Sequence, residues 1–457
     1  MPVLIFVLRG VIGALKRLFS GIACAGALLL SGCTGLSFTV DTLLNAPKLT
    51  EEQSEIHQAL IERVGSNITL KYPKNGENRS AFVIADIDEE PTEEALVFYE
   101  YSANSGKDGL RVNVLDKDDD GKWYSVKELA GGGTDIDRVL ISAVGDSNDT
   151  DVLVGYQNLT STEKNLEIYR YKNGEFDRIA ADTYSVMEPL DINGDGHNEI
   201  VTISKTLNPD TGSVITAASL LRTQAGEITK DAGIPMCDNV TDYVQSKAGN
   251  IEQGRGAIFV DALNADGNLQ TEIVYYRYSK LQNPMQQSPE KLLPMSTRPA
   301  GYYCTDIDND SVIEIPTTSA MIGYENAVPE EMLYMTSWSV YKDFYDLKEK
   351  FSGYYSISDG YFFAFPKRWN SSVTVKKDQE SGELVFYKYT GDINTSTAEI
   401  LRIGVSAKTK TERYIADGYE IVGSKGQLDY IVKLPLDKRE KLIPTIDEVS
   451  NNLYITD

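Results

Sequence analysis

Oxygen-bearing side chains recur in the segment Asp191–Glu199 at a spacing that suits a hard cation. Ligand positions 1, 3, 5, 7 and 9 of this loop hold Asp191, Asn193, Asp195, His197 and Glu199. His197 offers its backbone carbonyl, and Gly196 stands at position 6, where a tight ring around an ion requires a positive φ. Because Ca²⁺ takes six to eight oxygen ligands, the pattern predicts a calcium site. The alternative is a turn rich in Asp, Asn and Gly that binds no metal.

A second loop repeats these oxygens at the same spacing. Its corresponding positions hold Asp306, Asp308, Asp310, Val312 and Glu314, with Val312 again offering its carbonyl. Ser311 replaces the glycine at position 6, which strains the ring. A calcium site and a plain turn therefore both remain open here.

Three further acidic turns begin at Asp86, Asp146 and Asp261. The first has the acids but places Pro91 at the glycine position, the second is too short, and the third is three residues too long. We interpret these three as turns without metal.

Each acidic turn lies between a short apolar strand and a second strand rich in β-branched residues, whereas an EF-hand loop would continue into a helix. The predicted second strands are 95–99, 152–156, 200–203, 273–276 and a fifth from Ile315 that Pro316 interrupts. The first three units end in another hairpin with a glycine turn, at Gly121, Gly174 and Gly226. Two hairpins per unit predict four antiparallel strands, which is the composition of one propeller blade.

These loops and hairpins resemble the FG-GAP/VCBS repeats of integrin α-subunit propellers. The resemblance covers residues 78–348 and implies a mainly β fold, a β-propeller of about five to seven four-stranded blades stabilised by Ca²⁺. We count five units in the sequence.

The N-terminus resembles a bacterial lipoprotein signal peptide over residues 1–33. Basic residues precede an apolar run from Leu18 to Leu30, which is too short for a comfortable transmembrane helix. The run ends in Leu30-Ser31-Gly32-Cys33, a lipobox-like motif. The resemblance implies lipidation of Cys33 and a chain held at the cell membrane on its extracytoplasmic side. An uncleaved anchor is the alternative.

Residues 34–77 are expected to form a tether and a short helix. Thr50 and Gln53 form a capping-box pattern before an apolar stripe, and Gly65 marks the end of the helix. From residue 350 to 457 the pattern changes to strands near 373–376, 384–389, 400–406, 419–422 and 430–434 and a helix over 445–453. This predicts a small α+β, sandwich-like C-terminal domain, weakly similar to the PsbP/Mog1-like fold.

Charge and composition narrow the functional classes. A net charge of −24 argues against nucleic-acid binding, which depends on Lys and Arg. Cys237 and Cys304 either pair outside the cytoplasm or remain buried thiols. We find no nucleophile elbow, phosphate-binding loop or histidine-rich metal site.

The sequence therefore favours a surface-anchored, calcium-stabilised binding or adhesion scaffold without catalysis, whose ligand is an unidentified protein or carbohydrate. Two alternatives remain open: a secreted propeller enzyme that acts on polysaccharide, where two carboxylates would suffice, and a protein of envelope assembly.

Overall fold

The computed structural model describes residues 49–102, 109–147, 149–159, 161, 163–207, 210–238, 240–328, 331–437 and 439–456. The chain divides into two compact units, Met1–Glu55 and Ile56–Asp457. The predicted signal peptide with Cys33 and the tether as far as residue 48 lie outside the described residues. No helix among the residues described is both long enough and apolar enough to cross a membrane.

The first described element is helix α3 (Glu51–Val64). Its capping box is confirmed, because the Gln53 N–H donates to Thr50 Oγ1 at 3.1 Å and the Thr50 N–H donates to Gln53 Oε1 at 3.2 Å. Ile56 and Leu60 form its fully buried stripe. Gly65 ends the helix with a φ of +85°, as a C-terminal glycine does.

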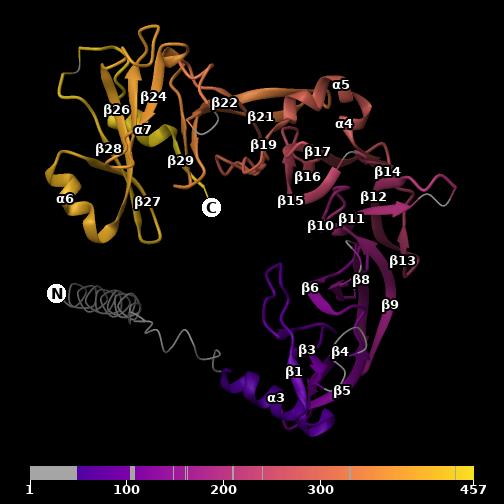
Figure 1. Ribbon diagram of the computed structural model, residues 1–457. Coiled ribbons are helices and arrows are strands. Elements are labelled where there is room, and N and C mark those ends of the chain that lie inside the picture. The colour runs from indigo at the N-terminus through magenta and orange to yellow at the C-terminus, as the bar shows by residue number, and fades with distance from the viewer. Residues whose placement is uncertain are drawn as a thin grey trace, which may run out of the picture. The chain divides into compact units, whose positions relative to one another are not determined.

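The described part of the chain is mainly β and forms six antiparallel sheets (Figure 1). Sheet 1 contains β1 (Ile68–Leu70), β2 (Phe82–Ala85), β3 (Glu94–Tyr101), β4 (Leu110–Lys117) and β5 (Trp123–Ala130). Sheet 2 contains β6 (Asp135–Ser142), β7 (Asp151–Gln157), β8 (Lys164–Lys172) and β9 (Glu175–Tyr184). Sheet 3 contains β10 (Val186–Leu190), β11 (Glu199–Leu207), β12 (Val214–Gln224), β13 (Glu227–Lys230) and β14 (Ile234–Pro235).

Sheet 4 contains β15 (Val240–Ile251), β16 (Arg255–Asn264), β17 (Asn268–Arg277), β18 (Lys280–Gln282) and β19 (Arg298–Pro299). Sheet 5 contains β20 (Ile315–Ala320), β21 (Tyr334–Lys342), β22 (Asp346–Ser356), β23 (Tyr361–Ala364) and β29 (Leu453–Ile455). Sheet 6 contains β24 (Val373–Lys377), β25 (Leu384–Lys388), β26 (Glu399–Ala407), β27 (Glu420–Lys425) and β28 (Leu428–Lys433). The short helices are α4 (Pro284–Gln287), α5 (Pro289–Leu292), η2 (Pro294–Ser296), η3 (Lys367–Trp369), η4 (Lys408–Lys410), α6 (Thr411–Ala416) and α7 (Ile446–Asn452).

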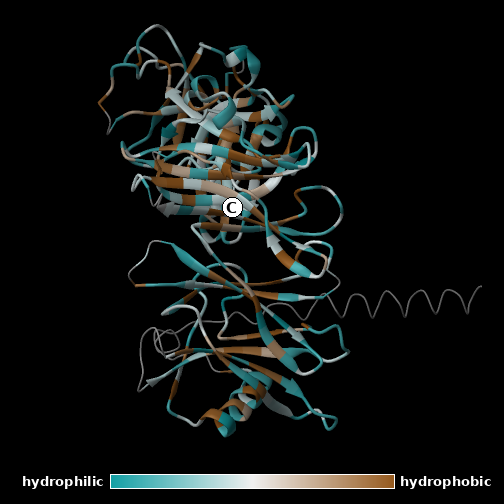
Figure 2. Cartoon of the chain, turned by 90° about the vertical axis from the view of Figure 1, so that its right-hand side faces the viewer, coloured by the Kyte–Doolittle hydropathy of each residue, from teal (hydrophilic) through white to brown (hydrophobic). Residues whose placement is uncertain are grey.

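The core is a series of clusters, most of which are shared by two sheets that follow one another in the sequence; one further cluster, around Trp338, belongs to sheet 5 alone. Leu96 of sheet 1 packs in one cluster with Val154 of sheet 2, and Leu153 of sheet 2 packs in the next with Ile200 of sheet 3. The same arrangement continues between sheets 3 and 4, 4 and 5, and 5 and 6. Hydrophobic residues gather on the strands, while the loops are mostly hydrophilic (Figure 2). Each sheet thus buries its apolar side chains against its neighbours, since one sheet alone cannot.

Strands are confirmed at all five predicted positions, as β3, β7, β11, β17 and β20, although β17 is the third strand of sheet 4 and β20 is the first strand of sheet 5. The three glycine turns are confirmed as well, with φ values of +77° at Gly121, +75° at Gly174 and +84° at Gly226. The turn predicted to begin at Asp261 is wrong. Asp261 lies within β16, paired with Thr271 of β17, and the hairpin turn falls between Asn264 and Asn268.

The strands and the helix predicted for the C-terminal segment are confirmed, as β24 to β28 and α7. Thr445 caps helix α7, because its side-chain hydroxyl accepts a hydrogen bond from the Glu448 N–H at 3.1 Å. The predicted junction near residue 350 falls inside β22, which runs without a break from Asp346 to Ser356. The division into domains at 348–350 stays a prediction.

Candidate metal centre

Four sheets share one feature at the start of a strand, which is β3 in sheet 1, β7 in sheet 2, β11 in sheet 3 and β20 in sheet 5. An acidic residue opens the strand or directly precedes it, and it is at most 1% exposed in every case: Glu94, Asp151, Glu199 and Glu314. The backbone N–H seven residues earlier faces each acid. Ile87 donates to Glu94 Oε2 and Ile307 to Glu314 Oε2, both at 2.9 Å. A buried carboxylate of this kind needs further positive or donating partners.

Burial raises the pKa of the three glutamates to about 7. Burial also raises the pKa of Asp151, and Arg170 beside it acts in the opposite direction. Removing the carboxylates from water disfavours their charged form, so each site favours a cation that restores it. The four sheets differ in what supplies that charge.

In sheet 2, an arginine neutralises the buried acid. Arg170 donates from Nε to Asp151 Oδ1 at 2.8 Å and from Nη2 to Oδ2 at 3.1 Å. The N–H that faces Asp151 belongs to Val144, so the first and third ligand positions fall on Ala143 and Gly145. Neither residue has a side-chain oxygen, which explains why this loop suits a guanidinium rather than a metal ion.

In sheet 5, a lysine neutralises the buried acid. The Lys350 ammonium lies 2.9 Å from Asp308, 2.6 Å from Asp310 and 2.8 Å from Glu314. Burial acts to lower the pKa of Lys350, but the hydrogen bonds to these acids raise it. The ammonium therefore holds the position that the sequence pattern assigns to a cation. Ser311 adopts a φ of +70°, the left-handed conformation expected where it replaces glycine.

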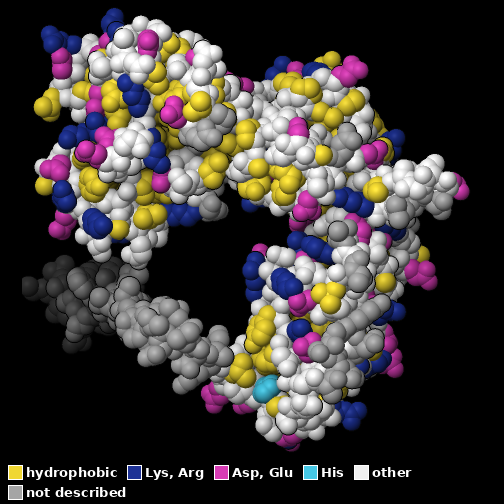
Figure 3. Space-filling model, in the orientation of Figure 1, with side chains coloured by type: hydrophobic (Ala, Val, Ile, Leu, Met, Phe, Trp, Pro, Cys, Tyr) yellow, Lys and Arg dark blue, Asp and Glu magenta, His cyan; other side chains and the backbone are white. Residues whose placement is uncertain are grey.

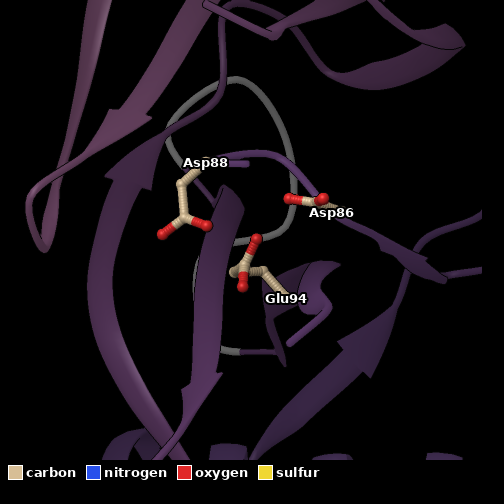
Figure 4. Close-up of side chains that lie close together, drawn as sticks. All are labelled: Asp86, Asp88 and Glu94. Atoms are coloured by element: carbon tan, nitrogen blue, oxygen red, sulfur yellow. The ribbon is translucent and has the colours of Figure 1, made fainter. Parts of the chain in front are cut away.

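Sheet 1 has no such protein cation among the described residues. Carboxylate oxygens of Asp86, Asp88 and Glu94 lie within 4.8 Å of one another (Figure 4). Glu94 is 1% exposed, and its Oε1 has no hydrogen-bond partner in the part of the chain described. Burial raises the pKa of Asp88, and the charges of Glu90, Asp116 and Asp86 raise it further, while the hydrogen bond from the Glu90 N–H lowers it. This acidic cluster could hold a metal ion.

The Asp86 loop is the site that sequence reasoning interpreted as a plain turn. Pro91 occupies position 6 there and cannot adopt a positive φ. The signal that could have identified the site is Glu94, which follows Asp86 by the same eight residues that separate Glu199 from Asp191 and Glu314 from Asp306.

Sheet 3 contains the Asp191 loop, whose three acids Asp191, Asp195 and Glu199 are not among the groups of described acids that lie within 4.8 Å of one another. Asp191 accepts from the N–H groups of Gly194, Asp195 and Gly196 at 2.8, 3.0 and 2.9 Å. The φ of Gly196 is +93°. His197 contributes to the loop through its backbone N–H, which donates to Asp195 Oδ1 at 2.9 Å.

The amide of Asn193 bridges the remaining acids of this loop. Its Nδ2 donates to Asp195 Oδ2 at 2.8 Å and to Glu199 Oε1 at 2.6 Å, while Glu199 Oε2 makes no hydrogen bond of regular geometry among the described residues. A half-turn of this amide would present its oxygen instead of its nitrogen. That rotation would also give up the hydrogen bond that Asn193 Oδ1 accepts from the Asp195 N–H at 2.8 Å, so a bound cation would have to compensate for its loss.

The two cysteines are free thiols, Cys304 buried and Cys237 partly buried. Cys237 Sγ accepts hydrogen bonds from Gln270 and Gln286 at 2.8 and 2.9 Å. Burial raises the pKa of Cys237 to about 11. Such a thiol is a poor nucleophile at neutral pH.

No protein-family model matches the chain, and no curated protein matches it. Among solved structures it is similar to the periplasmic gluconolactonase PpgL of Pseudomonas aeruginosa, with 12% identity over 67% of this chain and 81% of that one, at a TM-score of 0.28. It is also similar to the rhamnogalacturonan lyase YesW, with 10% identity over 73% and 76% of the two chains, at a TM-score of 0.29. Likeness at this level carries no argument about activity.

Proposed function

We propose that this chain is a lipid-anchored, non-catalytic binding scaffold whose sheets are blades of a β-propeller stabilised by Ca²⁺. The observation that carries the proposal is the contrast within one chain. Arg170 and Lys350 neutralise the strand-opening acids of sheets 2 and 5, whereas those of sheets 1 and 3 have no cationic side chain bound to them among the described residues. Ca²⁺ at the Asp86 and Asp191 loops would supply the missing charge.

Oxygen-only ligand sets favour Ca²⁺ over transition metals, which prefer imidazole and thiolate. Mg²⁺ demands near-ideal octahedral geometry and keeps its waters, so it should substitute poorly. Charges of both signs are interspersed over the face of the molecule in Figure 3, a surface that suits contact with protein or carbohydrate and not with nucleic acid.

The test is a thermal melt of the full chain in EDTA and in Ca²⁺. With Kd values on the order of 10⁻⁴–10⁻³ M, ~1 mM Ca²⁺ stabilises by roughly 0.4–1.4 kcal/mol per site. In a chain of this size, each kcal/mol of stabilisation raises the melting temperature by at most roughly 2–4 °C. We therefore expect a rise of a few degrees.

Glu94→Gln and Asp195→Asn should each remove part of this rise, because each deletes a charged ligand and keeps the side-chain size. Glu93→Gln is the matched control, since Glu93 is the exposed neighbour of Glu94. Identical wild-type melts in EDTA and in ~10 mM Ca²⁺, well above the expected Kd, would contradict calcium binding.

The anchor rests on the lipobox-like motif at Cys33. We expect the wild-type chain, expressed in bacteria, to take up a fatty-acid label and Cys33→Ala to take up none. A labelled Cys33→Ala chain would contradict lipidation at this residue.

A further inference from the structure

A small cavity of about 200 Å³ lies beside sheet 6, and none of its lining residues belongs to the calcium loops. Its lining includes Asp359, Tyr361, Lys377, Glu383, Gly404 and Tyr414. These residues come from the start of β23 and the turn before it, the β24–β25 hairpin, strand β26 and helix α6. The cavity has room for about six waters at ~30 Å³ each, or for one small polar ligand.

Glu383 is the unusual member of this lining. Its side chain is 5% exposed, its Oε2 accepts from the Tyr419 hydroxyl at 3.0 Å and from Arg402 Nη1 at 3.3 Å, and its Oε1 has no hydrogen-bond partner among the described residues. A Cβ at position 404 would lie 3.3 Å from Oε1, so Gly404 leaves space for this oxygen. A buried carboxylate with one unpaired oxygen is costly unless a donor reaches it.

The surrounding charge favours a cationic donor. Arg402 also contacts Asp378 at 3.3 Å and Glu399 at 2.8 Å, so three carboxylates share one guanidinium. Arg402 lies beside the cavity and does not line it. Among the described residues that do line it, Asp359 is a further acid and the exposed Lys377 is the one base. The group therefore carries a net negative charge.

The geometry points to a site for the protonated primary amine of a small ligand, and we propose that this cavity binds such an amine. A metal ion fits this site less well than an amine, because Arg402 already pairs with Glu383 and with two neighbouring acids. An ammonium needs only one carboxylate and can also contact aromatic rings, and Tyr361 and Tyr414 both line the cavity. Lys350 in the Asp306 loop shows an ammonium held by carboxylates in this same chain.

The amine could be carried by a sugar or by an alkyl chain. The test is isothermal titration of the full chain, without Ca²⁺, with glucosamine and with cadaverine. N-acetylglucosamine and 1-pentanol serve as neutral probes of similar size. Saturable binding of glucosamine alone would assign an amino sugar, and saturable binding of cadaverine alone would assign an alkylamine.

Glu383→Gln should weaken the binding by about tenfold or more, because it removes a charge-assisted hydrogen bond. Glu380→Gln, an exposed acid of the same hairpin, should leave it unchanged. Tyr414→Leu keeps the carboxylate and should weaken binding less than Glu383→Gln; it tests the site even if Glu383→Gln fails to fold.

Three results would overturn the proposal: equal binding of the neutral probes, unchanged binding by Glu383→Gln, or no saturable binding of either amine up to ~50 mM, an affinity worth only about 2 kcal/mol. None of these depends on the calcium loops, so the outcome is independent of the proposed function.

Discussion

At the scale of single residues, one buried acid recurs at the start of a strand and the chain neutralises it in different ways. Arg170 and Lys350 do so from within the protein, and Asn193 offers only a neutral amide. Because the loop around Glu314 keeps the oxygens of a cation site, the Lys350 ammonium and a metal ion would compete for one position.

Lys350→Met should convert the Asp306 loop into a calcium site. In EDTA we expect a loss of roughly 2–3 kcal/mol, less than the ~3–5 kcal/mol for a fully buried pair, because the Lys350 side chain is 24% exposed. Added Ca²⁺ should recover much of that loss, since Asp308, Asp310 and Glu314 would then bind the ion. Thermal melts with and without Ca²⁺ measure both effects.

Lys348→Met is the control for this change. Lys348 lies on the same strand, is 58% exposed and pairs with Asp346 instead of the loop. It should cost little, because exposed pairs contribute roughly 0–1 kcal/mol. A Lys350→Met chain that is no more responsive to Ca²⁺ than wild type would show that this loop is only a turn.

At the scale of elements, close contacts between strands set the size of side chains that a sheet accepts. A Cβ at Gly155 of β7 would lie 1.8 Å from the Tyr184 hydroxyl of β9. That hydroxyl donates to the fully buried Asp137 of β6 at 2.7 Å. The glycine thus allows one hydrogen bond to cross the whole of sheet 2.

Gly155→Ala should therefore displace Tyr184 and destabilise the chain by roughly 2–4 kcal/mol, from overpacking and from the hydrogen bond lost at a buried carboxylate. Tyr184→Phe should cost less, because it loses the hydrogen bond but keeps the packing. Urea unfolding of both variants and of the double variant measures the coupling between the two sites. Strictly additive losses would contradict a direct contact.

At the scale of the whole molecule, sheet 5 is completed by the last described strand. β29 pairs with β23, so Tyr454 stands opposite Phe362, and their rings stack with centroids 6.1 Å apart. Tyr454 also meets Phe351 of β22 at 5.3 Å. Residues 365–452, which include sheet 6, are therefore an insertion between two neighbouring strands of sheet 5.

A chain that ends at Asn452 should be less stable by roughly 2–4 kcal/mol, since it loses a paired strand and the aromatic contacts of the half-buried Tyr454. A chain that ends at Ile455 keeps β29 and is the control. Limited proteolysis followed by mass spectrometry should also detect new cuts near β23 in the shorter chain. Equal stability of the two chains would mean that β29 contributes nothing to sheet 5.

The sequence by itself determined the local features of this protein. Thr50 and Gln53 specify their capping box, Gly196 specifies its left-handed turn, and the glycine hairpins and second strands follow from turn chemistry and alternation. These features depend on residues within a few positions of one another, where covalent geometry limits the choices.

Tertiary structure alone decided which acid meets which partner. Lys350 reaches Glu314 from 36 residues away and Arg170 reaches Asp151 from 19, while Glu94 meets no cationic side chain among the described residues. Spacing along the chain cannot show these pairings, because strand register and sheet packing bring distant residues together. For the same reason, the sequence did not predict that β29 pairs with β23 in sheet 5, because a short apolar strand does not specify which strand it pairs with.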